Sequence, residues 1–388
     1  MSLRDAIITR IRTDGPMPFA EYMDLALYDP TLGYYARADR RSGRAGDFFT
    51  SVDTGSLFGE LLSKQFGQMW RIVTSQAGSD QGHCDLVEAG AGNGRLARDI
   101  LDRSTVADPE FYAAVRYTLV ERSAAGRRAH TSTLDPHRSK LHGSGVELPS
   151  RVHGIIFANE LLDALPVHPI VMTGDGLREV YVDADGQRLV ERLGPMSSAV
   201  RAHVERFRIR LEPGWRAEVC PAAVSWVEAA GRCLDRGFLI LVDYGHDAAE
   251  LYSLTHATGT LASYQRHHVA TDVTGSGPSP PWLEEPGTGD ITAHVDLTAV
   301  RQAAESVGLQ TLGILDQTYF VLGLASAELA ETESDEDDSD SEAMKRRLAL
   351  KTLLLPGGLG STHKVLIFGK NVGAPQLLGC SFSVRATR

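Results

Sequence analysis

The segment from residue 84 to residue 123 constrains the fold more than any other part of the chain. It begins with the apolar run CDLVEAG, which stops at glycines, continues through GRLARDILDRS and ends with a second apolar run, RYTLVERS. The spacing of Leu96, Ile100 and Leu101 predicts a helix between two strands. This alternation predicts a βαβ unit, and therefore an α/β fold with a parallel sheet and helices on both faces.

Further apolar runs predict the rest of this sheet. HGIIFANE (153–160) and GFLILVDYGH (237–246) are expected strands, and their nearly unbroken apolar character indicates burial on both faces. Near the end of the chain, LGILDQTYFVLGL (312–324) and THKVLIFGK (362–370) are expected to add an antiparallel pair of strands. The predicted sheet is therefore Rossmann-like, with an antiparallel edge.

Four regions are expected along the chain. Residues 1–80 form a helical and loop-rich region, 81–165 the first half of the sheet domain, 166–236 an inserted antiparallel lid, and 237–388 the second half of the sheet domain. Within the insert, LREVYVDADGQRLVERL alternates around Asp185 and Gly186, which predicts a hairpin.

Composition and charge exclude several classes of protein. The formal net charge is −11, so a protein that grips a nucleic-acid backbone is not expected. Eight of the acidic residues fall in ETESDEDDSDSE (331–342), which predicts a disordered loop. The four cysteines are far apart and indicate neither a zinc site nor disulfides. No membrane-spanning or signal segment is expected, and cytoplasmic localisation fits best.

The loop after the first predicted strand carries the pattern ExGxGxG, in which Glu88, Gly90, Gly92 and Gly94 occupy the fixed positions. Glycines at a strand-to-helix turn allow a ligand to approach the backbone closely. A dinucleotide site requires GxGxxG, and Arg95 stands where its last glycine is needed. Together with the carboxylate two residues before the first glycine, this spacing favours S-adenosylmethionine as the cofactor.

Glu121, at the end of the second predicted strand, is the expected ribose ligand. A carboxylate at this position accepts hydrogen bonds from both ribose hydroxyls. The alternative is a solvent-facing glutamate at a strand end, and the glycine loop at the appropriate topological distance favours binding.

Several sequence blocks together resemble the MidA-like family of S-adenosylmethionine-dependent methyltransferases. In chain order the blocks are GPMPFAEYMDLALYDPTLGYY, GDFFTSVDTGSLFGELL, LVEAGAGNG, ANELLDALPVH, LILVDYGH, HHV and GDITAHVDLT. The chain departs from the family at Ala91, where a proline is usual, at Val52 and Asp53, where a proline and a glutamate are usual, and in the NELLDALP block, which commonly reads NEFFDALP. The acidic run 331–342 also falls outside the family pattern.

The resemblance implies a class I methyltransferase fold and a function. Mitochondrial members of the family act on an arginine of a respiratory complex I subunit during its assembly. A protein substrate is therefore expected here, whereas no nucleic-acid partner and no membrane insertion are expected. The substrate, the number of methyl groups added and the oligomeric state are left open, with a homodimer as one alternative.

The resemblance also directs attention to ANELLD, which follows a predicted strand whose end faces the methyl group in this fold class. An arginine nucleophile is cationic, and Glu160 and Asp163 are the expected catalytic carboxylates that orient it. Asn159 is expected to hold the cofactor through its amide. The alternative is that Asn159 caps a short helix over residues 160–165.

GDFFTS is the second polar motif that the resemblance assigns to the site. Asp47 is expected to be catalytic, and Thr50 and Ser51 are expected to bind the cofactor, with the adjacent aromatic rings helping to hold its sulfonium. The alternative is an ordinary turn leading into a helix. Asp243, Tyr244 and His246 in VDYGH form a weaker substrate-side candidate.

No metal is expected from the sequence. The side chains that suggest one match no standard ligand spacing; they are His267, His268, Asp290, His294 and Asp296. Two other function classes stay open: an assembly chaperone that binds S-adenosylmethionine with little catalysis, and a nucleotide-dependent oxidoreductase, which the glycine spacing disfavours.

Overall fold

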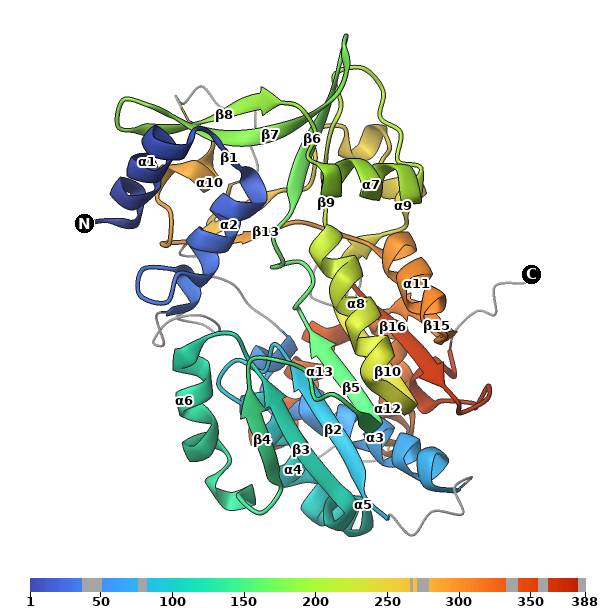
Figure 1. Cartoon of the computed structure of the whole chain (residues 1–388). Coiled ribbons are helices and arrows are strands. Elements are labelled where there is room, and N and C mark those ends of the chain that lie inside the picture. The colour runs from blue at the N-terminus through green and yellow to red at the C-terminus, as the bar shows by residue number, and fades with distance from the viewer. Residues whose placement is uncertain are drawn as a thin grey trace. The chain divides into compact units, whose positions relative to one another are not determined.

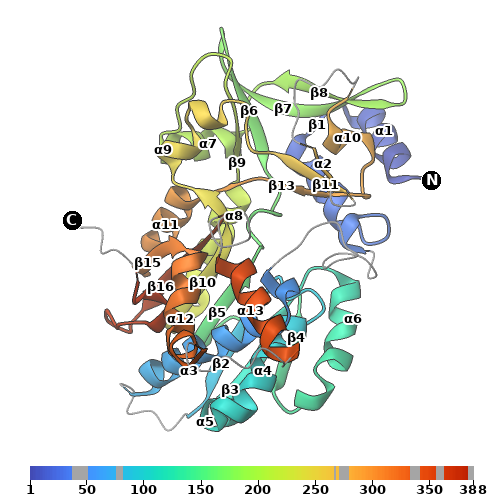
Figure 2. The same cartoon turned by 180° about the vertical axis from the view of Figure 1, so that it is seen from behind.

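The computed structural model describes residues 1–36, 51–75, 82–265, 268–270, 279–332, 341–354 and 362–382. The chain divides into two compact units, which are drawn in Figure 1 and, from behind, in Figure 2. One, which we call the antiparallel unit, comprises Met1–Phe49, Leu161–Val227 and Gly245–Ala303. The other, which we call the parallel-sheet unit, comprises Thr50–Glu160, Glu228–Tyr244 and Ala304–Arg388.

A mixed sheet forms the centre of the parallel-sheet unit (Figure 1). Its strands run in the order β15 (Gln310–Asp316), β16 (His363–Lys370), β10 (Leu234–His246), β5 (Val152–Asn159), β2 (Cys84–Ala89), β3 (Val115–Val120) and β4 (Leu141–Gly145). From β10 to β4 all neighbours are parallel, while β16 pairs antiparallel with both β10 and β15. This arrangement confirms the predicted α/β fold class and its antiparallel edge.

Helices pack against this sheet because their apolar stripes face it. α3 (Leu57–Ser75), α4 (Arg95–Ala107), α12 (Gln317–Thr332) and α13 (Ser341–Leu354) join the strands in one core, to which Phe66, Ile100 and Phe320 contribute from helices and Phe157 contributes from β5. The C-terminal part of α8 (Pro221–Cys233) covers the opposite face, as the two views show (Figures 1 and 2). α5 (Pro109–Ala114) and α6 (Ala124–Thr133) lie in the connections between strands β2, β3 and β4.

The antiparallel unit contains a five-stranded sheet. Its order is β1 (Met17–Pro18), β7 (Gly176–Asp185), β6 (His168–Thr173) and β9 (Arg216–Val219), and β8 (Arg188–Gly194) pairs with β7. The β7–β8 pairing extends to Asp185 and Arg188, which confirms the predicted hairpin. α1 (Leu3–Asp14), α2 (Phe19–Tyr28) and α10 (Pro281–Glu284) pack in a core with this sheet that includes Ile7, Tyr22 and Trp282.

The remainder of the antiparallel unit consists of short elements. A three-stranded sheet has the order β12 (His268–Ala270), β11 (Ala262–Gln265) and β13 (Asp290–Thr292). α7 (Ser198–Phe207) packs on β6 and β9 through Val200 and Ile170. α9 (Ala248–Leu251), β14 (Val295–Asp296) and the start of α11 (Leu297–Ser306) complete the unit.

The grouping of residues differs from the predicted division at several points, of which two are large. Residues 245–303 belong to the antiparallel unit, together with the inserted segment, rather than to the sheet domain. The N-terminal region is divided, since residues from Thr50 onward belong to the parallel-sheet unit. The inserted segment alone therefore does not make up the second unit.

One predicted strand is only half a strand. Residues 310–316 form β15, but TYFVLGL continues as helix α12. The reason is burial: Phe320, Val321 and Leu324 recur at helical spacing and are all at most 4% exposed in the core. A run of β-prone residues thus becomes a helix because only that conformation places these three side chains on one buried face.

The acidic run lies between two helices. Residues 331–332 end α12 and residues 341–342 begin α13, whereas residues 333–340 lie outside the described residues. The expected disorder of this run therefore stays a prediction. Among the helices that the structure describes, none combines the length and the apolar character needed to cross a membrane.

Candidate functional site

The glycine loop connects β2 to α4 in the parallel-sheet unit. Gly90, Gly92 and Gly94 have φ angles of 71°, 54° and 84°, a region that residues with a Cβ rarely adopt. The backbone N–H of Gly90 donates to the Val120 carbonyl at 2.9 Å, which attaches the loop to the end of β3. A Cβ built on Gly92 would meet no described atom within 4 Å, so the backbone there faces open space. The loop is a preformed turn with room for a ligand.

Glu121 lies directly against this loop. Its carboxylate accepts the Gly92 N–H at 2.8 Å and the Ser123 N–H at 2.6 Å, and the side chain is buried. Gly126 of α6 approaches equally closely, because a Cβ there would stand 2.4 Å from the Gly92 carbonyl oxygen. The structure therefore brings together the glycine loop and the carboxylate that the sequence predicted as neighbours. Sequence reasoning missed Gly126.

Glu88 is the second-last residue of β2 and is buried, with 3% of its surface exposed. The Tyr117 hydroxyl donates to Glu88 Oε2 at 2.7 Å. Burial raises the pKa of Glu88 to about 8, and the negative charges of Asp99 and Glu121 act in the same direction. Burial therefore favours the neutral form of this carboxyl group, two residues before the first glycine of the loop.

His130 of α6 also supports the loop, and no sequence motif points to it. Its Nε2 donates to the Gly92 carbonyl at 3.0 Å, because a carbonyl can only accept. Its Nδ1 then accepts from the Ser144 hydroxyl at 2.9 Å. Burial lowers the pKa of His130, so the ring stays neutral and joins the loop to β4.

The turn after β5 is not a helix. Residues 160–165 form bends and turns, which excludes the alternative that Asn159 caps a helix over them. Glu160 instead has a φ angle of 51°, and its backbone N–H donates to the Val242 carbonyl at 2.8 Å. For a residue with a side chain this left-handed conformation costs about 1–2 kcal/mol. Such strain is typical of functional turns.

The Glu160 carboxylate lies close to polar groups from distant segments of the parallel-sheet unit. Oε1 accepts from Asn159 Nδ2 at 3.1 Å and from the Ser51 backbone N–H at 3.4 Å. It also lies 3.5 Å from Nε2 of the buried His363, whose ring contacts that of Tyr244 with 3.9 Å between centroids. The structure thus brings together three of the predicted site residues, Ser51, Asn159 and Glu160, and adds His363 from β16.

Two buried polar atoms in this cluster lack a partner among the residues that the structure describes. They are Asn159 Oδ1 and Gln317 Nε2. Gln317 is fully buried, and its Oε1 accepts from the Ser51 hydroxyl at 3.1 Å. Unsatisfied buried polar atoms are costly, so each needs an explanation, and a polar ligand is one. Sequence reasoning missed Gln317, which lies in the run predicted as a strand.

Asp163 belongs to the antiparallel unit. The Asp163 side chain is buried, with 5% of its surface exposed. Its negative charge acts on Tyr35: burial of the Tyr35 hydroxyl, together with the charges of Asp290 and Asp163, raises the pKa of Tyr35 well above its usual value. The Tyr35 hydroxyl donates to both carboxylate oxygens of Asp290 at 3.1 Å. Asp163 therefore shares its surroundings with an aspartate and a tyrosine that sequence reasoning did not connect with it.

Other predicted residues have mixed outcomes. Asp47, Thr50 and His267 lie outside the described residues. Asp243 is 2% exposed in β10 and accepts from the Tyr244 backbone N–H at 2.9 Å. Their predicted roles therefore stay predictions.

Comparison with known proteins places this geometry in context. A family model described as "Putative S-adenosyl-L-methionine-dependent methyltransferase" matches residues 61–315. The mouse mitochondrial protein arginine methyltransferase NDUFAF7 is 32% identical over 343 residues, which cover 81% of this chain and 72% of the mouse protein. The human protein of the same name is 30% identical, over 81% of this chain and 71% of its own length.

A solved structure is similar over nearly the whole chain. It is a protein from Burkholderia thailandensis, described as a "likely methyl transferase" bound to S-adenosyl-homocysteine, with a TM-score of 0.84 and 27% identity. The match covers 98% of this chain and 94% of that one. Another solved structure from the same organism is also similar to this chain, with a TM-score of 0.79.

Proposed function

Because the chain belongs to this family of S-adenosylmethionine-dependent methyltransferases, we propose that it transfers the methyl group to an arginine side chain of a protein. The observation that carries the proposal is the buried polar cluster around Glu160, at the carboxyl end of β5. In a parallel sheet, ligands bind beyond the carboxyl ends of the strands. The mouse and human relatives are named protein arginine methyltransferases, which supports arginine as the acceptor.

The residues present fit the cofactor. Gly92 leaves space at the loop, and the Glu121 carboxylate beside it suits the two ribose hydroxyls. The unsatisfied Asn159 Oδ1 suits the ammonium of the amino-acid part, which is a hydrogen-bond donor. Ser51 lies next to the same cluster, and we assign Thr50 beside it to cofactor binding as well.

Side chains of this protein position the nucleophile. When bound, S-adenosylmethionine supplies an electrophilic methyl group, and transfer requires a nitrogen lone pair in line with it. Glu160 accepts hydrogen bonds from the guanidinium and so fixes its orientation and charge. Methylation releases a proton from that guanidinium, and we assign its uptake to Glu160 Oε1. This oxygen lies 3.5 Å from His363 Nε2. Asp47 and Asp163 are proposed as further carboxylates for the cationic substrate.

A radiolabel experiment tests this function. The purified protein is incubated with S-adenosylmethionine labelled in its methyl group and with extract from cells that lack the protein. Labelled protein bands are expected with the wild type and with Glu110→Gln, a matched control at an exposed glutamate. Glu160→Gln is expected to bind the cofactor and leave the bands unlabelled. Cofactor binding by the wild type without any labelled protein would favour an assembly chaperone instead.

The cellular setting is part of the proposal. A subunit of a respiratory complex is the substrate class that the family resemblance implies, and a cytoplasmic location is expected from the sequence. Labelling of separated cell fractions distinguishes these settings, since the fraction that holds the substrate is the one in which label appears.

A further inference from the structure

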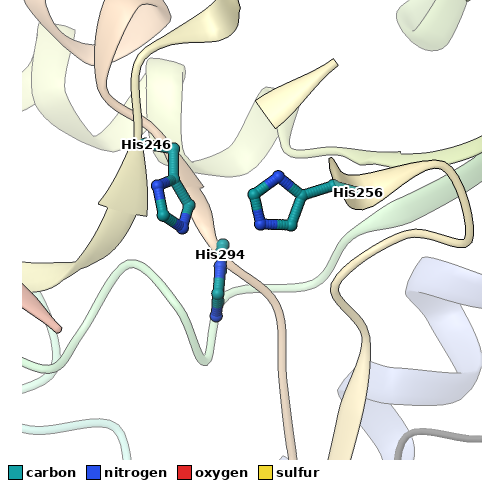
Figure 3. Close-up of side chains that lie close together, drawn as sticks. All are labelled: His246, His256 and His294. Atoms are coloured by element: carbon teal, nitrogen blue, oxygen red, sulfur yellow. The ribbon is translucent and has the colours of Figure 1, made fainter. Parts of the chain in front are cut away.

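Three histidines converge in the antiparallel unit (Figure 3). His246 ends β10, His256 ends the short helix η4 (Leu254–His256), and His294 lies between β13 and β14. Each offers one nitrogen, and the three nitrogens lie within 4.8 Å of one another. The ring centroids of His246 and His256 are 4.7 Å apart, and those of His246 and His294 are 5.1 Å apart.

The backbone holds these histidines on connected elements. β10 pairs with β14 at Gly245 and Val295 and at His246 and Asp296, which fixes His246 beside the strand that follows His294. The Tyr252 hydroxyl donates to Asp296 Oδ2 at 3.0 Å and so attaches the segment between α9 and η4 to the same strand. The convergence is therefore built into the fold and does not depend on exposed side chains meeting by chance.

Glu250 orients two of the three rings. His256 Nδ1 lies 3.0 Å from the Glu250 backbone carbonyl, which can only accept, so this nitrogen carries the proton and Nε2 carries the lone pair. His246 Nδ1 lies 3.2 Å from Glu250 Oε1, with the same consequence for its Nε2. Metal-binding histidines almost always donate their other N–H to a carboxylate or a carbonyl in this way.

His294 supplies the third observation. Its Nδ1 is buried and has no hydrogen-bond partner among the residues that the structure describes. Its backbone N–H is held by the Thr260 hydroxyl oxygen at 3.1 Å, so the residue is fixed while its ring is unsatisfied. A buried imidazole nitrogen without a partner needs an explanation, and a bound cation supplies one.

We propose that His246, His256 and His294 bind a divalent transition-metal ion, of which Zn²⁺ fits best. Glu250 does not bind the ion but accepts hydrogen bonds from two of the histidines and so orients them. Three imidazoles suit zinc at about 2.0–2.1 Å from each nitrogen, with a fourth position for water. Two nitrogens on one ion are then at most about 4.2 Å apart. The three nitrogens lie within 4.8 Å of one another, so small rotations of the imidazole rings bring them to the distances that one ion requires.

This site could not be predicted from the sequence. The three histidines are separated by long stretches of chain, and none belongs to a short metal-binding motif. Of these three histidines, only His294 belongs to the group of side chains that suggested a metal from the sequence. The proposal does not depend on methyl transfer, because it concerns ligand binding in the antiparallel unit alone.

Zinc titration of the full-length protein tests the proposal. After removal of metal with a chelator, the protein is titrated with Zn²⁺ against a chromophoric competitor, and its melting temperature is followed. We expect one equivalent of Zn²⁺ to bind with a Kd of micromolar or below and to raise the melting temperature, since the ion binds the folded state preferentially. Absence of stoichiometric binding by the wild type would overturn the proposal without recourse to any variant.

Variants identify the ligands. Glu250→Gln is expected to weaken zinc binding by about 10–100-fold, as loss of an outer partner does, and His256→Ala by more. His142→Ala, at an exposed histidine of β4, is the matched control and is expected to bind like the wild type. Circular dichroism checks folding. Undiminished binding in a folded His256→Ala variant would assign the zinc elsewhere and contradict the site.

Discussion

Replacement of Glu121 by glutamine tests two roles of one carboxylate, the predicted ribose contact and the support of the glycine loop. In the structure the Glu121 carboxylate accepts the Gly92 N–H at 2.8 Å and the Ser123 N–H at 2.6 Å. Glutamine keeps the size of the side chain, but its single oxygen satisfies one N–H and its NH₂ group faces the other donor. A hydrogen bond to a charged group contributes about 1.5–3 kcal/mol, so we expect Glu121→Gln to lose about 2 kcal/mol of stability.

The same substitution should weaken cofactor binding through the ribose. Loss of the charged acceptor for the hydroxyls costs about 1.5–3 kcal/mol, which corresponds to an affinity about 10–100-fold lower. Calorimetric titration with S-adenosylmethionine measures this, and urea unfolding measures the stability separately. Both losses are expected together, because one carboxylate serves both purposes.

Ser123→Ala is the matched control for this experiment. It removes the hydroxyl that accepts the Gly126 N–H at 3.3 Å and caps α6, but it keeps the backbone N–H that Glu121 binds. We expect a stability loss of about 1 kcal/mol, typical of a lost cap, with unchanged cofactor affinity. A folded Glu121→Gln variant that binds the cofactor as tightly as Ser123→Ala would refute the assignment of Glu121 to the ribose.

Three further predictions concern other parts of the chain. Burial raises the pKa of Glu88 from 4.5 to about 8, so its contribution to stability is present at low pH and is lost as the pH rises through that range. The free energy of unfolding of the wild type should therefore fall relative to that of Glu88→Gln by about 1 kcal/mol per pH unit between pH 5 and pH 8. If the two proteins lose stability with pH in parallel, the raised pKa of Glu88 is excluded. Deletion of residues 331–342 should leave the melting temperature and cofactor affinity nearly unchanged, and a large drop in either would assign the run a structural role. Glu160→Gln and Asp163→Asn should stay folded, bind cofactor and lose most methyl transfer, whereas full activity in both would remove them from catalysis.

The sheet and the cofactor loop were predictable from the sequence because their signals are local. Unbroken apolar runs define β2, β5 and β10, and the spacing of glycines defines the loop after β2. The proximity of Glu121 to Gly92 followed from topology alone, since the ends of adjacent parallel strands meet at one edge. These features need no knowledge of tertiary packing.

Features that depend on long-range packing could not be read from the sequence. The helix from Gln317 onward consists of residues that also suit a strand, and only burial of Phe320 against the core decides between them. His363 reaches Glu160 because β16 runs antiparallel beside β10, a pairing that brings distant residues together. The left-handed turn at Glu160 is equally invisible in the sequence, because no glycine marks it.

Mass spectrometry of methylated peptides tests the central claim most directly. Proteins from cells with and without this chain are digested, and methylation sites that depend on the chain are located by fragmentation. We expect at least one arginine that carries a methyl group only when the wild-type protein is present, and loss of that group when Glu160→Gln replaces it. Methylation that depends on the chain but lies on another type of side chain, or on no protein at all, would contradict the account.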